Sequence, residues 1–157
     1  MKAVSIAEIK QELINLPPKK ISELCLRLAK YKKENKELLS YLLFDAHDPR
    51  IFMENIKNEI SGQFTELPKA NWYLTKKSLR KILRSITKYS RHIGSSESAV
   101  EMLIYFCIQV KASGIPFQQN RVLSNLYNQQ LKKINTLMES IHEDLRFDYK
   151  RQLEQLS

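Results

Sequence analysis

The sequence predicts an all-α protein, arranged as an irregular bundle or a short curved stack of antiparallel helical hairpins with six to seven helices. Two observations predict this fold class. Apolar residues recur at three- and four-residue spacing along nearly the whole chain, which is the period of a helix with one buried face. The 157 residues include only 3 glycines and 5 prolines, too few for a sheet with tight hairpin turns. The length predicts a single helical domain over residues 1–157.

The first predicted helix begins with a capping box at Ser5 to Glu8. In such a box the serine hydroxyl accepts a hydrogen bond from the backbone three residues on, while the glutamate carboxylate reaches back to the serine backbone. Apolar residues then fall on one face of the helix. Pro17 and Pro18 stop it, because proline in a helix interior removes a backbone donor and clashes with the preceding turn.

The second and third predicted helices follow with little between them. Apolar residues lie three or four positions apart from Ile21 to Tyr31, which predicts one buried stripe. After Asn35 the segment KELLSYLLF is more apolar, and it predicts a short, well-buried third helix.

The fourth predicted helix starts at Asp48 and Pro49, since aspartate caps helices well and proline is favoured in the first turn. Asp45, His47 and Asp48 also form the nearest thing in the chain to a set of metal ligands. We favour the helix boundary, because capping explains Asp48 and an exposed turn explains the other two. No metal site is predicted. The buried stripe of this helix comprises Ile51, Phe52, Ile56, Ile60 and Phe64.

The fifth predicted helix follows a break at Pro68, with Thr75 as its cap and Gly94 as its left-handed C-terminal residue. Trp72 and Tyr73 lie in the break. They either plug the core or stand exposed as a platform for stacking, and the plug is favoured because large aromatic side chains are usually buried.

The last part of the chain predicts one central helix and one long helix. Ser95 or Ser96 restarts the chain, and the following segment is apolar almost all round until Gly114 ends it. A heptad-like seam then runs from Leu123 to Leu145 and can continue to Leu156.

Cysteines and hydropathy bear on the cellular compartment. Cys25 and Cys107 lie among apolar neighbours without a spacing motif, so we expect reduced, buried thiols. The start of the sequence has no apolar core of signal-peptide length. The longest uncharged apolar run, residues 102–110, is less than half of the roughly 20 residues that cross a bilayer. We therefore expect a cytoplasmic protein without a transmembrane segment.

The positive charge of the protein is concentrated in the fifth helix. Residues 67–96 contain eight Lys or Arg and no acid, which accounts for +8 of the net +9. At 100° per residue, seven of these side chains fall within an arc of about 140°, and apolar residues occupy the opposite side. The seven are Lys76, Lys77, Arg80, Lys81, Arg84, Lys88 and Arg91.

Two kinds of explanation fit this charge. In the first, acids from the next helix or the last helix neutralise the face, or the face is simply solvated. The candidate acids are Glu97, Glu101, Glu139, Glu143, Asp144 and Asp148. In the second, the face binds something outside the chain.

The function predicted from the sequence is a helical binding or scaffolding module whose basic helix face contacts an acidic protein partner. The alternative is a nonspecific nucleic-acid-binding protein that uses the same face, without a motif that reads base sequence. An anionic membrane surface is disfavoured, because the apolar side of this helix is needed for the core.

Enzyme chemistry finds no support in the sequence. The three glycines are isolated, so no phosphate-binding loop exists. His47, His92 and His142 are far apart in sequence, and no nucleophile, base and orienting group can be placed together. We predict no enzyme activity, no catalytic residues and no cofactor.

Three stretches carry a resemblance to a known family. They are ISELCLRLAKYKKENKELLSYLL, SLRKI and SGIPF. With these in order, the chain from Ile6 to Tyr127 resembles a family of uncharacterised bacterial proteins, catalogued only as a domain of unknown function. The resemblance implies a helical fold and no particular activity.

Overall fold

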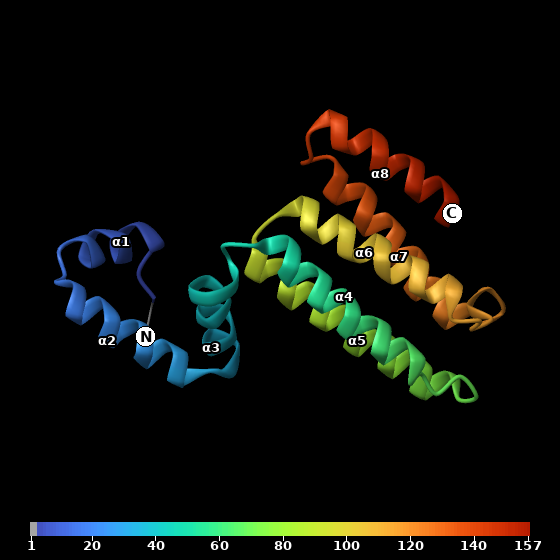
Figure 1. Ribbon diagram of the computed structural model, residues 1–157, viewed down its shortest axis with the longest axis horizontal. Helices are drawn as coiled ribbons and strands as arrows, with labels where there is room; N and C mark the ends of the chain where they lie inside the picture. The colour runs from blue at the N-terminus through green and yellow to red at the C-terminus, as the bar shows by residue number, and fades with distance from the viewer. Residues whose placement is uncertain (1–2) are drawn as a thin grey trace. The chain divides into compact units, whose positions relative to one another are not determined.

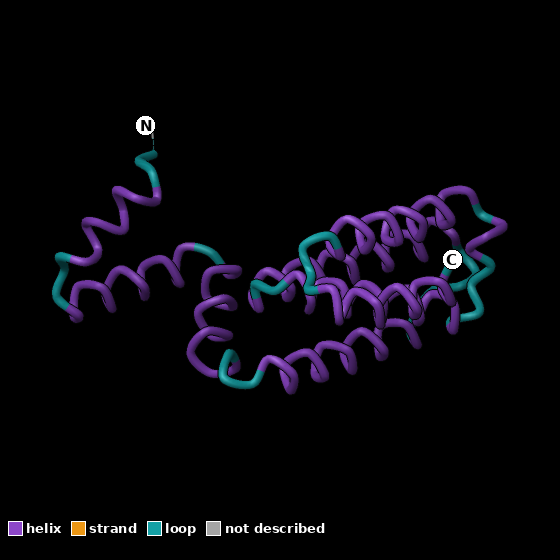
Figure 2. Tube along the Cα trace, turned by 90° about the horizontal axis from the view of Figure 1, so that it is seen from above, coloured by secondary structure: helices purple, strands orange, loops and turns teal. Residues whose placement is uncertain are grey.

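The computed structural model describes residues 3–157, which form eight α-helices and no strand (Figures 1 and 2). The all-α class is therefore confirmed. The predicted number of six to seven helices is wrong by at least one.

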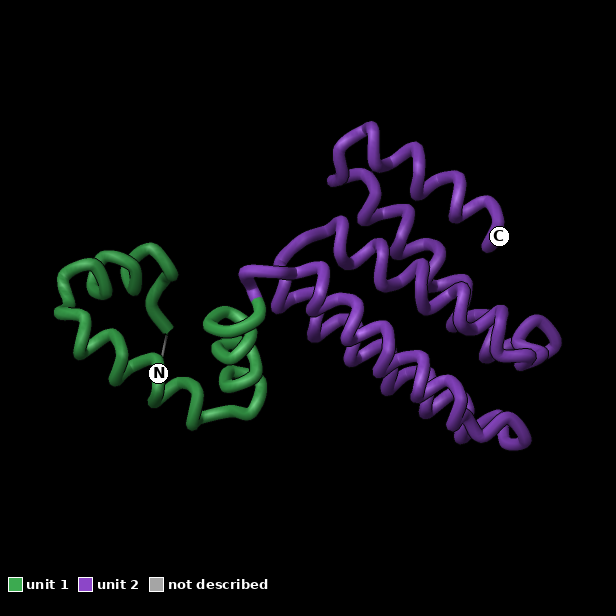
Figure 3. The backbone as a smooth tube through the Cα atoms, in the orientation of Figure 1, with its two compact units in different colours: residues 1–45 green, residues 46–157 purple. Residues whose placement is uncertain are grey.

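The chain divides into two compact units, residues 1–45 and residues 46–157 (Figure 3). We call them the first unit and the second unit. The division describes packing within the chain, and the expectation of a single domain over residues 1–157 stays a prediction.

The first unit contains α1 (Ile6–Ile14), α2 (Pro18–Tyr31) and α3 (Lys33–Ser40). A five-residue π-helix, η1 (Tyr41–Asp45), continues α3. The predicted capping box is confirmed, since the Ser5 backbone N–H donates to Glu8 Oε2 over 2.7 Å and the Glu8 backbone N–H donates to the Ser5 hydroxyl. Pro18 is the first residue of α2. Proline is favoured there, because the backbone N–H that it lacks would have no hydrogen-bond partner within the helix.

The first unit has almost no core. Among residues 3–45 only Tyr41 is buried, and α1, α2 and α3 contain no buried residue. The prediction of a well-buried third helix is wrong, because Leu42, Leu43 and Phe44 are exposed. KELLSYLLF is apolar, so burying it would stabilise the protein. The rest of this unit does not bury it.

The second unit contains α4 (Pro49–Thr65), α5 (Trp72–Ile93), α6 (Ser96–Ala112), α7 (Arg121–Met138) and α8 (Glu143–Leu156). A short 3₁₀ turn, η2 (Phe117–Gln119), precedes α7. As predicted, α6 is central, and it packs against α4, α5, α7 and α8. Its buried residues are Val100, Met102, Leu103, Ile104, Phe106, Cys107 and Val110.

Local capping chemistry sets the start of α4 and both ends of α5. The Asp48 carboxylate accepts from the Ile51 backbone over 3.1 Å, as predicted for the cap of α4. Gly94 ends α5 with a φ of 72°, and Ser95 then caps α6. The predicted cap at Thr75 is wrong. Asn71 caps α5, while the buried Thr75 hydroxyl donates to the backbone carbonyl of Pro68.

The predicted seam from Leu123 to Leu145 is split into two helices. α7 ends at Met138, the chain turns at residues 139–142, and α8 starts at Glu143. Ile141 is buried in this turn, and the Arg146 guanidinium donates to the Ile141 carbonyl over 2.9 Å and to the Glu139 carbonyl over 3.1 Å. These bonds satisfy carbonyls that lack helical partners at the turn, so α8 folds back onto α6.

Within residues 3–157, no helix combines the length and the apolar character that crossing a membrane requires.

Candidate functional site

The candidate site is the basic face of α5, which we define as Lys76, Lys77, Arg80, Lys81, Arg84, Lys88 and Arg91. The opposite side of the same helix anchors it in the second unit, because Thr75, Leu79, Ile82 and Ile86 are buried. A helix of 22 residues with one fully buried stripe cannot rotate to hide its charges without exposing its apolar side chains to water. The fold therefore fixes the direction in which the basic face points.

Most of the basic face is exposed. Lys76 and Lys88 are half-buried, and the Lys88 ammonium lies 4.7 Å from the ring centre of Tyr89. The other five, Lys77, Arg80, Lys81, Arg84 and Arg91, are exposed. Within residues 3–157, these five side chains form no ion pair and no hydrogen bond.

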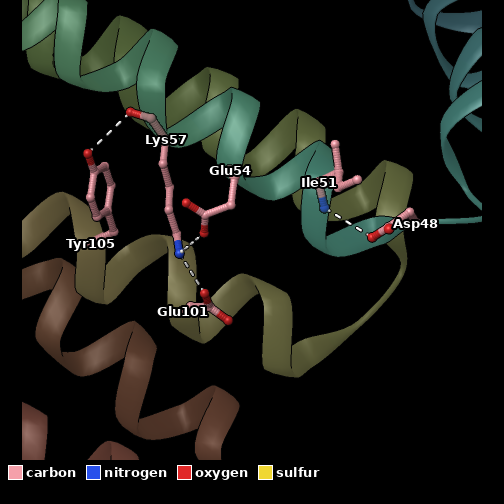
Figure 4. A network of polar contacts seen from close by, with 6 residues as sticks. All are labelled: Asp48, Ile51, Glu54, Lys57, Glu101 and Tyr105. Atoms are coloured by element: carbon pink, nitrogen blue, oxygen red, sulfur yellow. Dashed lines mark hydrogen bonds and ion pairs between the residues drawn. The ribbon is translucent and has the colours of Figure 1, made fainter.

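The acid Glu101 that could have neutralised this face binds a different cation. The Lys57 ammonium of α4 donates to Glu101 Oε1 on α6 over 2.7 Å and to Glu54 Oε1 over 2.9 Å. The Lys57 side chain is only 16% exposed, and the Tyr105 hydroxyl donates to its backbone carbonyl over 3.2 Å. Figure 4 shows these groups converging between α4 and α6.

Two more of the candidate acids, Glu97 and Asp148, act on Tyr149 of α8. Burial lowers the pKa of Lys57, but the bonds to Glu101 and Glu54 outweigh burial and leave that pKa raised. The pKa of Tyr149 is raised, first by burial and then by the charges of Glu101 and Glu97. Asp148 adds to the same effect. The charges of Glu97, Glu101 and Asp148 therefore act on Tyr149 of α8, and Glu101 also holds Lys57 in the α4–α6 contact.

The remaining candidate acids lie at the turn before α8. Asp144 is 3.5 Å from the His142 ring, and Glu143 lies in the first turn of α8, where a negative charge is favoured by the helix dipole. Glu139 is exposed. Within the described residues, none of the six acids pairs with the five exposed members of the basic face, so the structure gives no support to internal neutralisation by these pairs.

The sequence favoured Trp72 and Tyr73 as a plug of the core, and this prediction is wrong. Trp72 is 41% exposed and Tyr73 is 70% exposed. The reason is the cap at Asn71, which makes them the first two residues of α5, ahead of the buried stripe that starts at Thr75. Tyr73 precedes Arg80 by seven residues, almost two turns, so it lies on the same side of the helix as the basic face.

A cleft of about 480 Å³ opens at the C-terminal end of the basic face. Arg91 lines it from α5, Ser95 and Ser96 line it at the start of α6, and Lys133 lines it from α7. Sequence reasoning missed Lys133, because nothing in the spacing of α7 tells which helix its lysines face. The cleft brings two cations from different helices to one concavity.

The structure gives no sign of a metal site or a reactive thiol in the part of the chain that it describes. No group of three or more His, Cys, Asp and Glu is placed to hold a metal within residues 3–157. Burial raises the pKa of Cys107 to about 12, as expected for an inert thiol. The prediction of a buried Cys25 is wrong, because this residue is half-buried at an apolar groove between α2 and α3.

Comparison with known proteins adds no assignment, since the chain matches no family model, no curated protein and no solved structure. The resemblance to the uncharacterised bacterial family stays a prediction.

Proposed function

We propose that the protein is a binding or scaffolding module that contacts an acidic protein partner through the basic face of α5. The observation that supports this is the set of five exposed cations that have no partner within residues 3–157. From Lys76 to Arg91 the face extends for about 22 Å along one straight helix. An acidic helix or strand of similar length can follow it.

Charge repulsion within the face favours such a partner. Lys77, Lys81 and Arg84 are spaced by four and three residues, and like charges at this spacing cost a few tenths of a kcal/mol per pair. A carboxylate placed between two of these side chains removes that cost. Each exposed ion pair that it forms also contributes about 0.2–1 kcal/mol of binding free energy. Long-range attraction also speeds the encounter, because complementary charges steer association.

The cleft at the end of the face gives the proposed partner a fixed register. An acidic side chain that enters it meets Arg91 from α5 and Lys133 from α7. Two cations on one carboxylate, with part of the water displaced, bind more strongly than the same charges on a flat surface. We therefore expect the partner to place an acidic residue here.

Nonspecific binding to single-stranded nucleic acid is the second candidate, and Tyr73 favours it. This ring is 70% exposed on the same side as the basic face, and a base stacked on an aromatic ring gains about 1–3 kcal/mol. Phosphates then follow Arg80 and Arg84 along the helix.

A binding titration separates the two candidates. Trp72 is the only tryptophan in the chain and lies at the start of α5, so its fluorescence reports on ligands at this face. The probes are a glutamate-rich helical peptide and an oligothymidylate, each at several salt concentrations. The face variant changes Lys77, Lys81 and Arg84 to Gln. The control changes Arg50, Arg121 and Lys150 to Gln, which removes the same charge from exposed positions on α4, α7 and α8.

The proposal predicts that the acidic peptide binds more tightly than the oligonucleotide at equal ionic strength. The face variant should weaken peptide binding about tenfold, from three lost pairs at roughly 0.5 kcal/mol each, while the control keeps at least most of its affinity. Preference for the oligonucleotide, with loss on Tyr73→Ala, would favour the second candidate. Equal loss in the face variant and the control would reject both, because it would show that only net charge matters.

A further inference from the structure

The first unit carries apolar side chains that it does not bury. Ile6 of α1 is 80% exposed, Tyr31 of α2 is 78% exposed and Phe44 of η1 is 70% exposed. The other exposed large apolar residues from α1 to η1 are Ile9, Leu13, Ile14, Leu24, Leu26, Leu28, Leu38, Leu42 and Leu43. Monomeric proteins rarely leave so much apolar surface together, and such surfaces mark contact sites.

Helix physics shows that this surface must be covered for the unit to be stable. α1 has 9 residues and α3 has 8, whereas isolated helices shorter than about 12–15 residues are marginal in water. A unit of about 45 residues is near the size at which oligomerisation, a metal or disulfides are usually needed. The sequence nevertheless caps α1 with a full capping box, which stabilises a helix whose large apolar side chains stay 36% to 80% exposed.

Two apolar grooves show where a covering element fits. The first, about 500 Å³, lies between α1 and α2 and is lined by Ile6, Ile9, Lys10, Leu13, Ile14 and Ile21. The second, about 270 Å³, lies between α2 and α3 and is lined by apolar side chains that include Leu28, Leu38 and Leu42. Both grooves run between helices, which is the geometry that accepts a further amphipathic helix.

The second unit has no apolar face of comparable extent to offer. Its core is a single cluster of buried residues between Met53 and Leu156. Its exposed large apolar residues are spread one to three per helix over all five helices, and scattered side chains of this kind are normal on a protein surface. A second copy of the first unit, by contrast, carries an equally extensive set of exposed apolar side chains.

We propose that the first unit is a homodimerisation module, in which two copies of the chain interlock so that α1 of each copy lies along the α2–α3 groove of the other. A two-fold arrangement makes every contact twice, so one interface covers the apolar side chains of both copies. This inference concerns α1 to α3 and goes beyond the proposed function of α5.

Charge complementarity argues for a second copy rather than an unrelated protein. α1 carries Glu8 and Glu12 against a single lysine, while α2 carries three lysines and Arg27 against a single glutamate. Glu12 has no partner within residues 3–157, and neither do Arg27 and Lys30. An acidic α1 beside a basic α2 of the other copy pairs these charges at the rim of an apolar interface.

The test uses the full chain in sedimentation equilibrium from about 1 to about 100 µM, because mass action makes the dimer fraction depend on concentration. The expected mass approaches twice the 18.5 kDa of one chain as the concentration rises. Leu13→Glu puts a charge on the apolar side of α1, which the proposal seats in the α2–α3 groove of the other copy, and it should weaken the dimer at least tenfold. Gln11→Glu is the matched control, because it adds the same charge to the same helix outside the groove lining, and it should leave the mass unchanged.

A second pair of variants keeps the proposal testable if Leu13→Glu simply melts α1. Glu12→Lys should weaken the dimer about threefold to tenfold, and adding Arg27→Glu should restore much of the loss, whereas a purely structural effect would not be rescued. A chain that stays monomeric at about 100 µM, or a mass that exceeds two copies, would overturn the proposal. So would a dimer that Leu13→Glu and Glu12→Lys both leave intact.

Discussion

At the scale of single residues, Tyr127 links the pH of the solution to the packing of the core. Its ring lies against Phe117, with centroids 4.6 Å apart, and its hydroxyl donates to the Leu156 carbonyl at the end of α8 over 2.8 Å. Burial, followed by the neighbouring Cys107, raises the pKa of Tyr127 to about 12. The folded protein therefore holds this hydroxyl in its neutral, donating form.

The first prediction here concerns alkaline unfolding. Because the folded pKa of about 12 exceeds the ordinary tyrosine pKa of 10.0, the neutral hydroxyl stabilises the fold below pH 10, and this contribution is lost as pH rises from 10 towards 12. Tyr127→Phe removes the hydrogen bond and should lower the free energy of unfolding at pH 8 by about 0.5–1.5 kcal/mol. It should also flatten the loss of stability above pH 10. Urea midpoints measured at several pH values check both effects.

Tyr31→Phe is the control, because it makes the same substitution at a tyrosine that is 78% exposed, and it should leave the urea midpoint at pH 8 unchanged. A Tyr127→Phe variant that keeps the full wild-type slope above pH 10 would show that another group, such as Cys107, carries the alkaline transition.

Residue-scale features with a local cause could be read from the sequence. The capping box at Ser5, the cap at Asp48 and the left-handed Gly94 each depend on a few neighbouring positions. The cap of α5 could not be read in the same way. Asn71 and Thr75 are both good caps, and Thr75 instead became a buried residue whose hydroxyl bonds to Pro68.

At the scale of elements, α4 and α6 are joined by opposite charges, while five exposed basic side chains of α5 have no partner within residues 3–157. Glu101 on α6 accepts from Lys57 on α4 over 2.7 Å, in a contact where the lysine side chain is largely covered. Lys81 and Arg84 on α5 are exposed and have no such partner within residues 3–157. Substitutions at these two places should therefore change stability in opposite directions.

The second prediction is that removing the Glu101 charge destabilises the fold, whereas removing charges from the basic face stabilises it. Glu101→Gln leaves Lys57 with only Glu54 and should lower the free energy of unfolding by about 0.5–1 kcal/mol, a value discounted for the partial exposure of Glu101. The triple change of Lys77, Lys81 and Arg84 to Gln relieves repulsion and should raise stability by a few tenths of a kcal/mol. Glutamine matches lysine and arginine in helix propensity, so the helix itself is not weakened. Urea unfolding at low salt measures both variants.

High salt provides the control, because screening should shrink the gain of the triple variant more than the loss of Glu101→Gln. A clear drop in the stability of the triple variant would mean that the basic face has stabilising partners in the chain, and the proposal of an open binding face would fail.

At the scale of elements, prediction succeeded where the helical period alone sets the structure. It failed where contacts with other helices set it. The basic side and the buried side of α5 both follow from its 3.6-residue period. The split between α7 and α8 does not, because residues 139–142 contain no glycine or proline and the turn depends on Arg146 reaching back to Ile141. Lys133 joins Arg91 at the cleft for a similar reason, since only the packing of α7 near α5 and α6 brings them together.

At the scale of the whole molecule, the two units differ in how well their helices are supported. α6 contacts four other helices of its unit and buries seven residues, whereas α1, α2 and α3 bury none. The sequence could not reveal this difference, because both parts contain amphipathic helices with apolar residues at three- and four-residue spacing. Periodicity shows which side of a helix gains from burial, and only the fold shows whether that side is covered.

The third prediction follows from this unequal support. Local opening costs little where few apolar contacts break, so amides of residues 6–40 should exchange with deuterium far faster than amides of residues 96–112 in a dilute sample. If α1 to α3 form the proposed dimer, raising the concentration from about 1 to about 100 µM should slow exchange in residues 6–40, since mass action favours the associated state. Exchange in residues 96–112 should not change, because α6 is supported within its own unit.

Hydrogen exchange with peptide-level mass spectrometry measures both regions in one sample, and Leu13→Glu should abolish the concentration dependence. Slow, concentration-independent exchange in residues 6–40 would show that these helices are stable within a single chain, and the need for a covering copy would disappear.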